Sequence, residues 1–188
     1  MSKVVKILLF LFLPGALLGG IIFYFIRSAR RERNKDVIKD ESGMQLNFDF
    51  IKEFETGSLE PTLKVFRNKI DGNLEVGWGH VLPKIGWKEG DTITRAKAEE
   101  FFNQDIERAI DVYGSSLNWL DFTDNQRRAI ISHAYNTGAK SATIIRLANH
   151  FRWQELAAWF PKHYITSGGV EYEGLKRRRS YEASLLLS

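Results

Sequence analysis

Two glutamates, Glu55 and Glu75, stand twenty positions apart on either side of a turn sequence, Asp71-Gly72. Two carboxyl groups that flank a bond can cleave it, one donating a proton and the other acting as base or nucleophile, as in glycoside hydrolysis. The same pair is equally compatible with two solvated charges on a loop-rich surface. The interpretation therefore depends on whether the surrounding elements bring both side chains to one cleft.

The elements around the pair are a short helix and a hairpin. Residues 47–56 have the apolar spacing of an amphipathic helix, and Glu55 lies at its end. Two extended runs follow, at 63–66 and 74–78, and Asp-Gly between them is a strong hairpin-turn signal. Glu75 therefore lies on the second predicted strand, with its side chain on the face opposite to its immediate neighbours.

The remainder of the chain is predicted to be helical. Residues 94–113 repeat apolar positions with a helical period and stop at Gly114. Thr123 and Gln126 form a capping-box sequence that opens another helix, which ends at 136–138. Shorter helices are expected at 142–151, 153–160 and 175–187. The predicted fold class is α+β and mostly helical, with a small β-hairpin lobe followed by a helical lobe.

The amino-terminal segment has a different character. Residues 7–26 are about twenty apolar or small residues without a charge, which as a helix would cross a bilayer core roughly 30 Å thick. A cleaved signal peptide is the rival interpretation, but the run is long for one and no small-x-small cleavage site follows. We predict a transmembrane signal-anchor at 1–26, a charged juxtamembrane linker at 27–44 and a folded domain at 45–188.

The charge distribution limits the partners of the folded domain. The chain has 27 Lys and Arg and 23 Asp and Glu; eight bases and four acids fall in the first 44 residues, which leaves nineteen of each for the rest. The basic excess therefore lies beside the predicted span, where it suits anionic lipid headgroups and argues against nucleic acid as a partner. The run 177–179 of three arginines is expected to be a solvated helix face.

Metal and thiol chemistry have little support in the sequence. The chain has no cysteine, and its four histidines show no spacing typical of metal ligands. We predict neither a metal nor a cofactor.

Four segments together carry a family resemblance: FETG with VGWGH within 54–80, TRAKAEEFFNQDI at 94–106, AYNTG at 134–138 and GGVEYEGLKRRRSYEA at 168–183. Over residues 48–188 the chain resembles the phage-type lysozyme (endolysin) family, glycoside hydrolase family 24. The resemblance implies a two-lobed lysozyme-like domain and a muramidase that hydrolyses the β-1,4 bond between N-acetylmuramic acid and N-acetylglucosamine in peptidoglycan. It implies that Glu55 is the general acid and that Val81, Tyr135 and Asn136 contact substrate.

Two positions depart from the family pattern. Glu75 stands where the family has a threonine, and the family's aspartate position falls on Asn68 or on Lys69, depending on the alignment. Glutamate is one methylene longer than aspartate, so Glu75 is predicted to supply the ionised carboxylate and to activate water, which would give an inverting enzyme. The alternative is a catalytically inactive peptidoglycan-binding module that anchors a membrane assembly to the wall.

The predicted location is the bacterial inner membrane, with a monomeric single-pass chain and the lysozyme-like domain in the periplasm. Peptidoglycan lies on that side. The flanking charges point the other way, because five Lys and Arg follow the span at 27–35 and only Lys3 and Lys6 precede it. The side richer in these residues normally stays cytoplasmic.

Overall fold

The computed structural model describes residues 15–69 and 71–188, and its internal contacts divide the chain after Asp36. Helix α2 (Gly15–Val37) occupies most of the described part of the first unit. The predicted span at 7–26 begins outside the described residues. Within the described residues, no helix is both long enough and apolar enough to cross a membrane.

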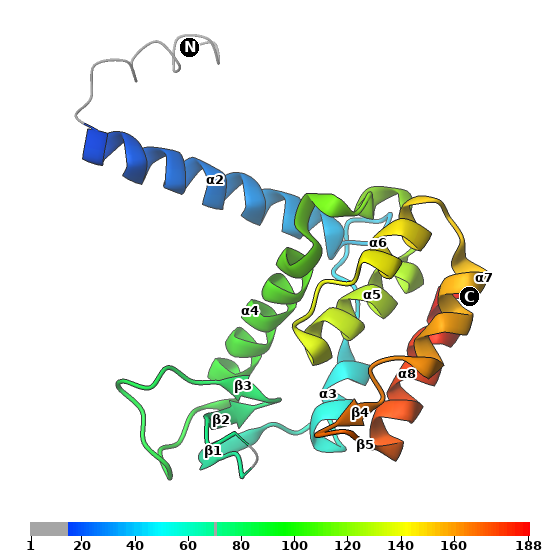
Figure 1. Cartoon of the computed structure of the whole chain (residues 1–188). Helices are drawn as coiled ribbons and strands as arrows, with labels where there is room; N and C mark the ends of the chain where they lie inside the picture. Colours follow the sequence, from blue (N-terminus) through cyan, green and yellow to red (C-terminus); the bar gives the residue numbers. More distant parts are fainter. Residues whose placement is uncertain (1–14, 70) are drawn as a thin grey trace. The chain divides into compact units, whose positions relative to one another are not determined.

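The second unit begins at Val37, eight residues earlier than the predicted start of the folded domain, and the Val37 side chain belongs to its core. A three-stranded sheet lies at one end of this unit and the helices at the other, joined by the long helix α4 (Figure 1). Its elements in chain order are α3 (Asp49–Thr56), β1 (Thr62–Arg67), β2 (Leu74–Gly77), β3 (His80–Val81), α4 (Arg95–Tyr113), α5 (Asp124–Thr137), α6 (Ala142–Asn149), α7 (Trp153–Trp159), β4 (Thr166–Ser167), β5 (Val170–Glu171) and α8 (Glu173–Leu186).

The sheet confirms the predicted hairpin and adds a third strand that the sequence did not predict. Its order is β1-β2-β3, and both strand pairs are antiparallel. Val65 and Val76 are buried with Phe101 of α4 in a small apolar cluster, so one face of the sheet packs on that helix. Strand β2 also presents Glu75, whose position alternates with that of Val76 and therefore faces the other side.

The helical lobe confirms the predicted helices and their caps. Thr94 accepts a hydrogen bond from the backbone N–H of Lys97, and Thr123 forms a complete capping box with Gln126. Gly138 ends α5 in the left-handed conformation, at φ 59°. Helix α5 packs between α4 and α8, and the buried residues of these helices belong to the main core. The α+β, mostly helical fold class is therefore confirmed.

The carboxyl-terminal segment differs from the prediction in one respect. The short antiparallel pair β4-β5 precedes the last helix, which begins at Glu173, two residues before the predicted start. Gly168 and Gly169 join the two strands with φ angles of 58° and 80°, values that glycine adopts without steric strain. The hydrophobic pattern of two-residue strands is too short to be detected from sequence.

Candidate active site

Glu55 lies in the last turn of α3, which ends because Gly57 adopts the left-handed conformation. The other side of the helix is fixed in the core by Phe50 and Ile51, so the position of Glu55 follows from the packing of α3. The carboxyl side chain is 21% exposed. An ionised carboxyl at this end of a helix faces the negative end of the macrodipole, and a nearby cation is needed to offset that repulsion.

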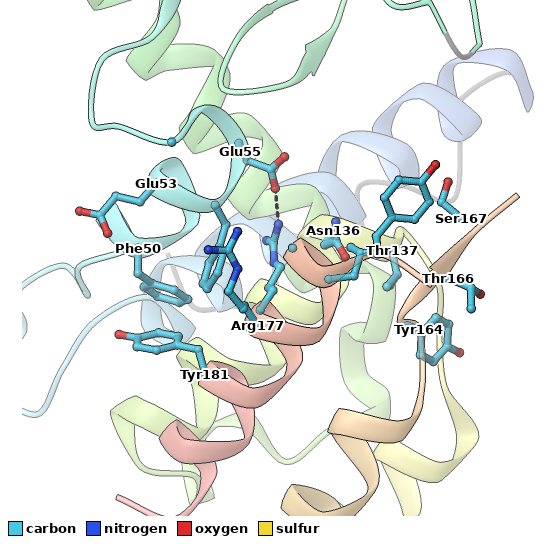
Figure 2. Close-up of a pocket in the computed structure, with 16 residues that line it drawn as sticks. Phe50, Glu53, Glu55, Asn136, Thr137, Tyr164, Thr166, Ser167, Arg177 and Tyr181 are labelled. Atoms are coloured by element: carbon cyan, nitrogen blue, oxygen red, sulfur yellow. Dashed lines mark hydrogen bonds and ion pairs between the residues drawn. The ribbon is translucent and has the colours of Figure 1, made fainter. Parts of the chain in front are cut away.

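Arg178 of α8 supplies this cation. Its Nη1 atom contacts Oε1 of Glu55, as the dashed line in Figure 2 marks. The Arg178 side chain is only 3% exposed, and its Nη2 atom donates to the carbonyl of Ser132 at 3.2 Å. A guanidinium held at several points has little freedom to leave its partner. Arg178 therefore orients the Glu55 carboxyl from a fixed position.

A buried carboxyl, Glu182, holds Arg178 in turn. Its Oε1 atom lies 3.3 Å from Nε of Arg178, and it accepts hydrogen bonds from Ser132 Oγ at 2.6 Å and from Arg179 Nη2 at 3.0 Å. Burial raises the pKa of Glu182, while the two guanidinium groups favour its charged form. Arg179 also donates to Oδ1 of Asn136 at 3.0 Å. Glu55 thus stands at the exposed end of a buried ionic network between α5 and α8.

This network corrects the expectation that 177–179 is a solvated helix face. Arg178 and Arg179 are 2% and 0% exposed, and of the three arginines Arg177 alone is exposed. The sequence did contain a signal. Glu182 follows Arg178 by four residues and Arg179 by three, which is the spacing at which charged side chains meet on one face of a helix.

The Gly77-Trp78-Gly79-His80 turn brings the sheet against Glu55. Gly77 and Gly79 have φ angles of 69° and 84°, and a Cβ atom at Gly79 would lie 3.5 Å from Oε2 of Glu55. Trp78 is buried, and its carbonyl accepts a hydrogen bond of 2.7 Å from the Tyr135 hydroxyl. Two glycines permit the close approach, and Tyr135 ties the turn to the helical lobe.

Glu75 lies on the exposed face of the sheet. Its Cα partners are Phe66 on β1 and Val81 on β3, so these three side chains are neighbours on one face. Phe66 is 39% exposed and Val81 is 45% exposed. The Oε1 atom of Glu75 accepts a hydrogen bond of 2.6 Å from Nδ2 of Asn68. Of the two candidates for the family's aspartate position, Asn68 is therefore the residue that meets Glu75.

The predicted site residues are divided between two cavities and the sheet face. Glu55 and Asn136 line a cavity of about 950 Å³, together with side chains from the β4-β5 hairpin and α8 (Figure 2). Val81, Tyr135 and Gly79 line a smaller cavity of about 210 Å³. Glu55 lines the larger cavity, and Gly79, which lines the smaller one, is its neighbour in the turn. Glu75 lines neither, and it adjoins the smaller one through its cross-strand neighbour.

His80 is a structural residue of this region. Its ring stacks on Phe101, with centroids 4.0 Å apart, and its Nδ1 atom lies 3.0 Å from Asp105, which also contacts Arg108. Burial lowers the pKa of His80 to about 4, and Arg108 and Lys97 act in the same direction. Asp105 would favour the imidazolium, but its charge is already offset by Arg108. A neutral His80 therefore ties β3 to α4 and is no source of protons near neutral pH.

Within residues 15–69 and 71–188, no three His, Asp or Glu side chains gather closely enough to hold a metal ion.

These features define a lysozyme-type protein: two lobes, a glutamate at the end of α3, and a glycine-rich turn that closes on it. The chain belongs to the phage lysozyme family, whose sequence model matches residues 52–182. The resemblance predicted from the sequence is confirmed.

Two endolysins are similar in sequence. The endolysin of Bacillus phage PZA is 31% identical over 147 residues, which are 77% of this chain and 54% of the relative. The endolysin of Bacillus phage B103 is 33% identical over 116 residues, which are 60% and 43% of the two chains. This chain therefore spans about half the length of the curated relatives it matches.

Solved structures share the fold. A P22 lysozyme variant superposes with a TM-score of 0.61 at 28% identity, covering 77% of this chain and 99% of the other. The endolysin of Escherichia coli O157:H7 phage FAHEc1 gives 0.61 at 27%, covering 77% and 94%. The muramidase domain of SpmX from Asticaccaulis excentricus gives 0.62 at 23%, covering 75% and 94%, and supports the fold alone.

Proposed function

We propose that this chain is a membrane-anchored muramidase that hydrolyses the β-1,4 bond between N-acetylmuramic acid and N-acetylglucosamine in peptidoglycan. The observation that carries the proposal is the placement of Glu55, held by Arg178 in the wall of the larger cavity and against the Gly79 turn. Membership of the phage lysozyme family supports the choice of substrate. Val81, Tyr135 and Asn136 are proposed as substrate contacts.

The proposed reaction uses Glu55 as the acid and Glu75 as the base. The reactive form is the one in which Glu55 carries a proton, and it gives this proton to the glycosidic oxygen while the bond from that oxygen to the anomeric carbon breaks. A water molecule bonds to the anomeric carbon from the opposite face of the sugar, and Glu75 accepts the proton that the water loses. The products are a sugar with a free 4-hydroxyl and a sugar with a new reducing end. Solvent then returns Glu75 and Glu55 to their starting protonation states.

A digestion assay tests the activity. The full chain, purified in mild detergent, is incubated with purified Gram-negative sacculi, and the released fragments are analysed by mass spectrometry after borohydride reduction. We expect soluble muropeptides that end in reduced N-acetylmuramic acid, and none with heat-denatured protein. Anhydro-sugar ends in excess of those in the untreated sacculi would contradict hydrolysis, because they form without the addition of water.

The alternative is a binding module of the same fold that holds peptidoglycan without cleaving it. The family's aspartate position falls on Asn68 or Lys69, and this favours the alternative, since neither side chain is a carboxylate that could act as base or nucleophile. It predicts that sacculi bind the protein in a pull-down and that no fragments are released. Fragments with reducing ends in the digestion assay would exclude it.

The stereochemistry of the product follows from the role of Glu75. A base that acts through water requires the two carboxyls to be roughly 6.5–9.5 Å apart and gives an inverted product, whereas roughly 5–5.5 Å indicates a covalent, retaining route. We expect inversion, so the α-anomer of the new reducing end should be the first product in an NMR time course of hydrolysis. Initial accumulation of the β-anomer would overturn the assignment of Glu75 as base.

The proposed anchor is the apolar segment 7–26, with the lysozyme domain in the periplasm. The length of this run suits a bilayer core, and the substrate lies outside the inner membrane. The charges at 27–35 oppose this orientation under the positive-inside rule. The requirement to reach peptidoglycan leads us to place the domain on the periplasmic side.

Protease accessibility tests the orientation. With the chain expressed in a Gram-negative host, protease added to spheroplasts should degrade the folded domain while a cytoplasmic control protein stays intact. Full protection until the membrane is permeabilised would reverse the proposed orientation. Extraction of the chain by alkaline carbonate would contradict the anchor itself, because integral membrane proteins resist it.

A further inference from the structure

The partner of Glu75 is the amide of Asn68, whose backbone is hydrogen-bonded on both sides. Asn68 follows β1 directly, its backbone N–H donates to the carbonyl of Asn73 at 2.8 Å, and its carbonyl accepts from the N–H of Gly72 at 2.9 Å. Because the turn fixes the Asn68 backbone, the short side chain has few positions available to it. Its Nδ2 atom reaches Oε1 of Glu75 at 2.6 Å.

The Asn68 amide is the hydrogen-bond donor recorded at the Glu75 carboxylate. Among the described residues, no Lys, Arg or His side chain forms an ion pair with Glu75, whereas Glu55 is paired with Arg178. A glutamate on an exposed sheet face would otherwise sample several rotamers, and fixing a rotamer-rich side chain costs about 1 kcal/mol or more. The hydrogen bond from Asn68 is therefore the contact that fixes the head of this side chain.

The contact also distinguishes the two carboxylate oxygens. Oε1 carries the short hydrogen bond from Asn68, so Oε2 is the oxygen that can accept a proton from an incoming water. Phe66 and Val81 flank Glu75 across the strands and restrict the side chain laterally. The combined effect is a carboxylate with one oxygen held by Asn68 and the other without a hydrogen bond to the described residues.

We infer that Asn68 is a positioning residue for the reaction, which holds the Glu75 carboxylate so that Oε2 faces the attacking water. The inference rests on the proposed muramidase function. It assigns a role to Asn68: the carboxylate is on β2, and the residue directly after β1 provides the amide that orients it. Asn68 acts through Glu75 and has no role in proton transfer.

Removal of the amide gives the first test. In the Asn68→Ala full chain we expect kcat on sacculi to fall by roughly 10- to 100-fold, the range for loss of one hydrogen bond to a charged group, with KM changed less than about twofold. Asn73→Ala is the matched control, because its side chain bonds Asp71, whereas the hydrogen bond to Glu75 comes from Asn68. It should retain the kcat of the wild type.

Lengthening one side chain of the pair and shortening the other distinguishes a positioning role of Asn68 from a general loss of structure. Asn68→Gln lengthens the donor by one methylene, and Glu75→Asp shortens the acceptor by one. Each single variant should lose kcat, and the double variant should recover at least several-fold over the weaker single variant. Non-additivity of this kind is expected only for residues in direct contact. Purely additive losses would overturn the inference.

An NMR measurement tests the contact without turnover. In Asn-selectively ¹⁵N-labelled full chain in detergent micelles, Glu75→Gln should move the side-chain amide signal of Asn68 and leave that of Asn73 in place. No turnover by the wild type would contradict the proposed function and remove any catalytic role for Asn68. An active wild type with unchanged kcat in Asn68→Ala, or an unmoved Asn68 amide signal, would overturn this inference alone.

Discussion

Replacing Glu55 with glutamine should lower kcat on sacculi by roughly 10²- to 10⁴-fold, the usual contribution of a general acid. Glutamine has the same shape and cannot donate a proton to the leaving oxygen. Its amide oxygen can still accept from Arg178, so the buried network should persist. Hydrolysis is measured as new reducing ends, and the melting temperature and sacculus pull-down should remain close to those of the wild type.

Glu53→Gln is the matched control for this variant. Glu53 lies in the same helix and borders the same cavity, and its carboxyl points away from that of Glu55 (Figure 2). The control removes one negative charge from the same region, so it should retain activity within about twofold. Equal loss in both variants would indicate an effect of charge on substrate binding, and retained activity in Glu55→Gln would exclude Glu55 as the acid.

The elements that were predicted from the sequence are those whose formation is determined by nearby residues. The hairpin is encoded by two extended runs and an Asp-Gly turn, and the helix that begins after Thr123 is encoded by its capping box. Apolar periodicity was sufficient for the long helix 95–113. The two-residue strands β3, β4 and β5 were missed, because such short strands are defined by their pairing partners and carry no periodic signal.

The candidate site was predicted in part for the same reason. The position of Glu55 follows from a helix end and a glycine, both visible in the sequence. The burial of Arg178 and Arg179 was predicted wrongly, because it depends on α8 packing against α5 and on Ser132, a residue remote in sequence. The local sequence does not determine whether consecutive charged residues are buried, because this depends on tertiary packing.

The pairing of Asn68 with Glu75 was beyond sequence reasoning alone. Counting from either end of the hairpin left Asn68 and Lys69 as alternatives, since the loop length and a register irregularity in β1 are not encoded by composition. A shift of one residue would move a side chain to the other face of the sheet. In the structure Phe66 lies opposite Glu75, and Asn68 is the residue that bonds it.

A second large effect is expected at low pH, where the free energy of unfolding should fall because of the buried His133. This side chain is 0% exposed, and neither ring nitrogen has a hydrogen-bond partner among the described residues. Burial lowers the pKa of His133 from 6.5 to about 3, and Arg179 and Arg178 add to the shift. The ring stacks on Phe160 and meets the edge of Tyr164. The native state therefore holds His133 neutral where the unfolded chain would bind a proton.

The sign of the effect follows from this difference in proton binding. Above pH 6.5 both states leave His133 neutral, and the stability is fully present. As the pH falls from 6.5 toward 3, the unfolded state gains a proton that the native state does not, so the free energy of unfolding decreases. The loss from this residue reaches about 5 kcal/mol at the lower limit. His80, with its pKa lowered to about 4, acts in the same direction over a narrower range.

Urea unfolding of the full chain between pH 7.5 and 4 measures this loss, and His133→Leu should reduce it. Leucine removes the titrating group and leaves no unpaired polar atom, so the variant should lie within about 1 kcal/mol of the wild type at pH 7.5. At pH 4 the variant should be more stable than the wild type by about 3 kcal/mol. Over the roughly 2.5 pH units between 6.5 and 4, the unfolded wild type binds a proton that its native state does not, and the variant lacks this effect. His150→Leu, at an exposed histidine in the same lobe, is the control and should follow the wild-type pH dependence. An unchanged pH dependence in His133→Leu would assign the acid sensitivity to His80 and the carboxyl groups.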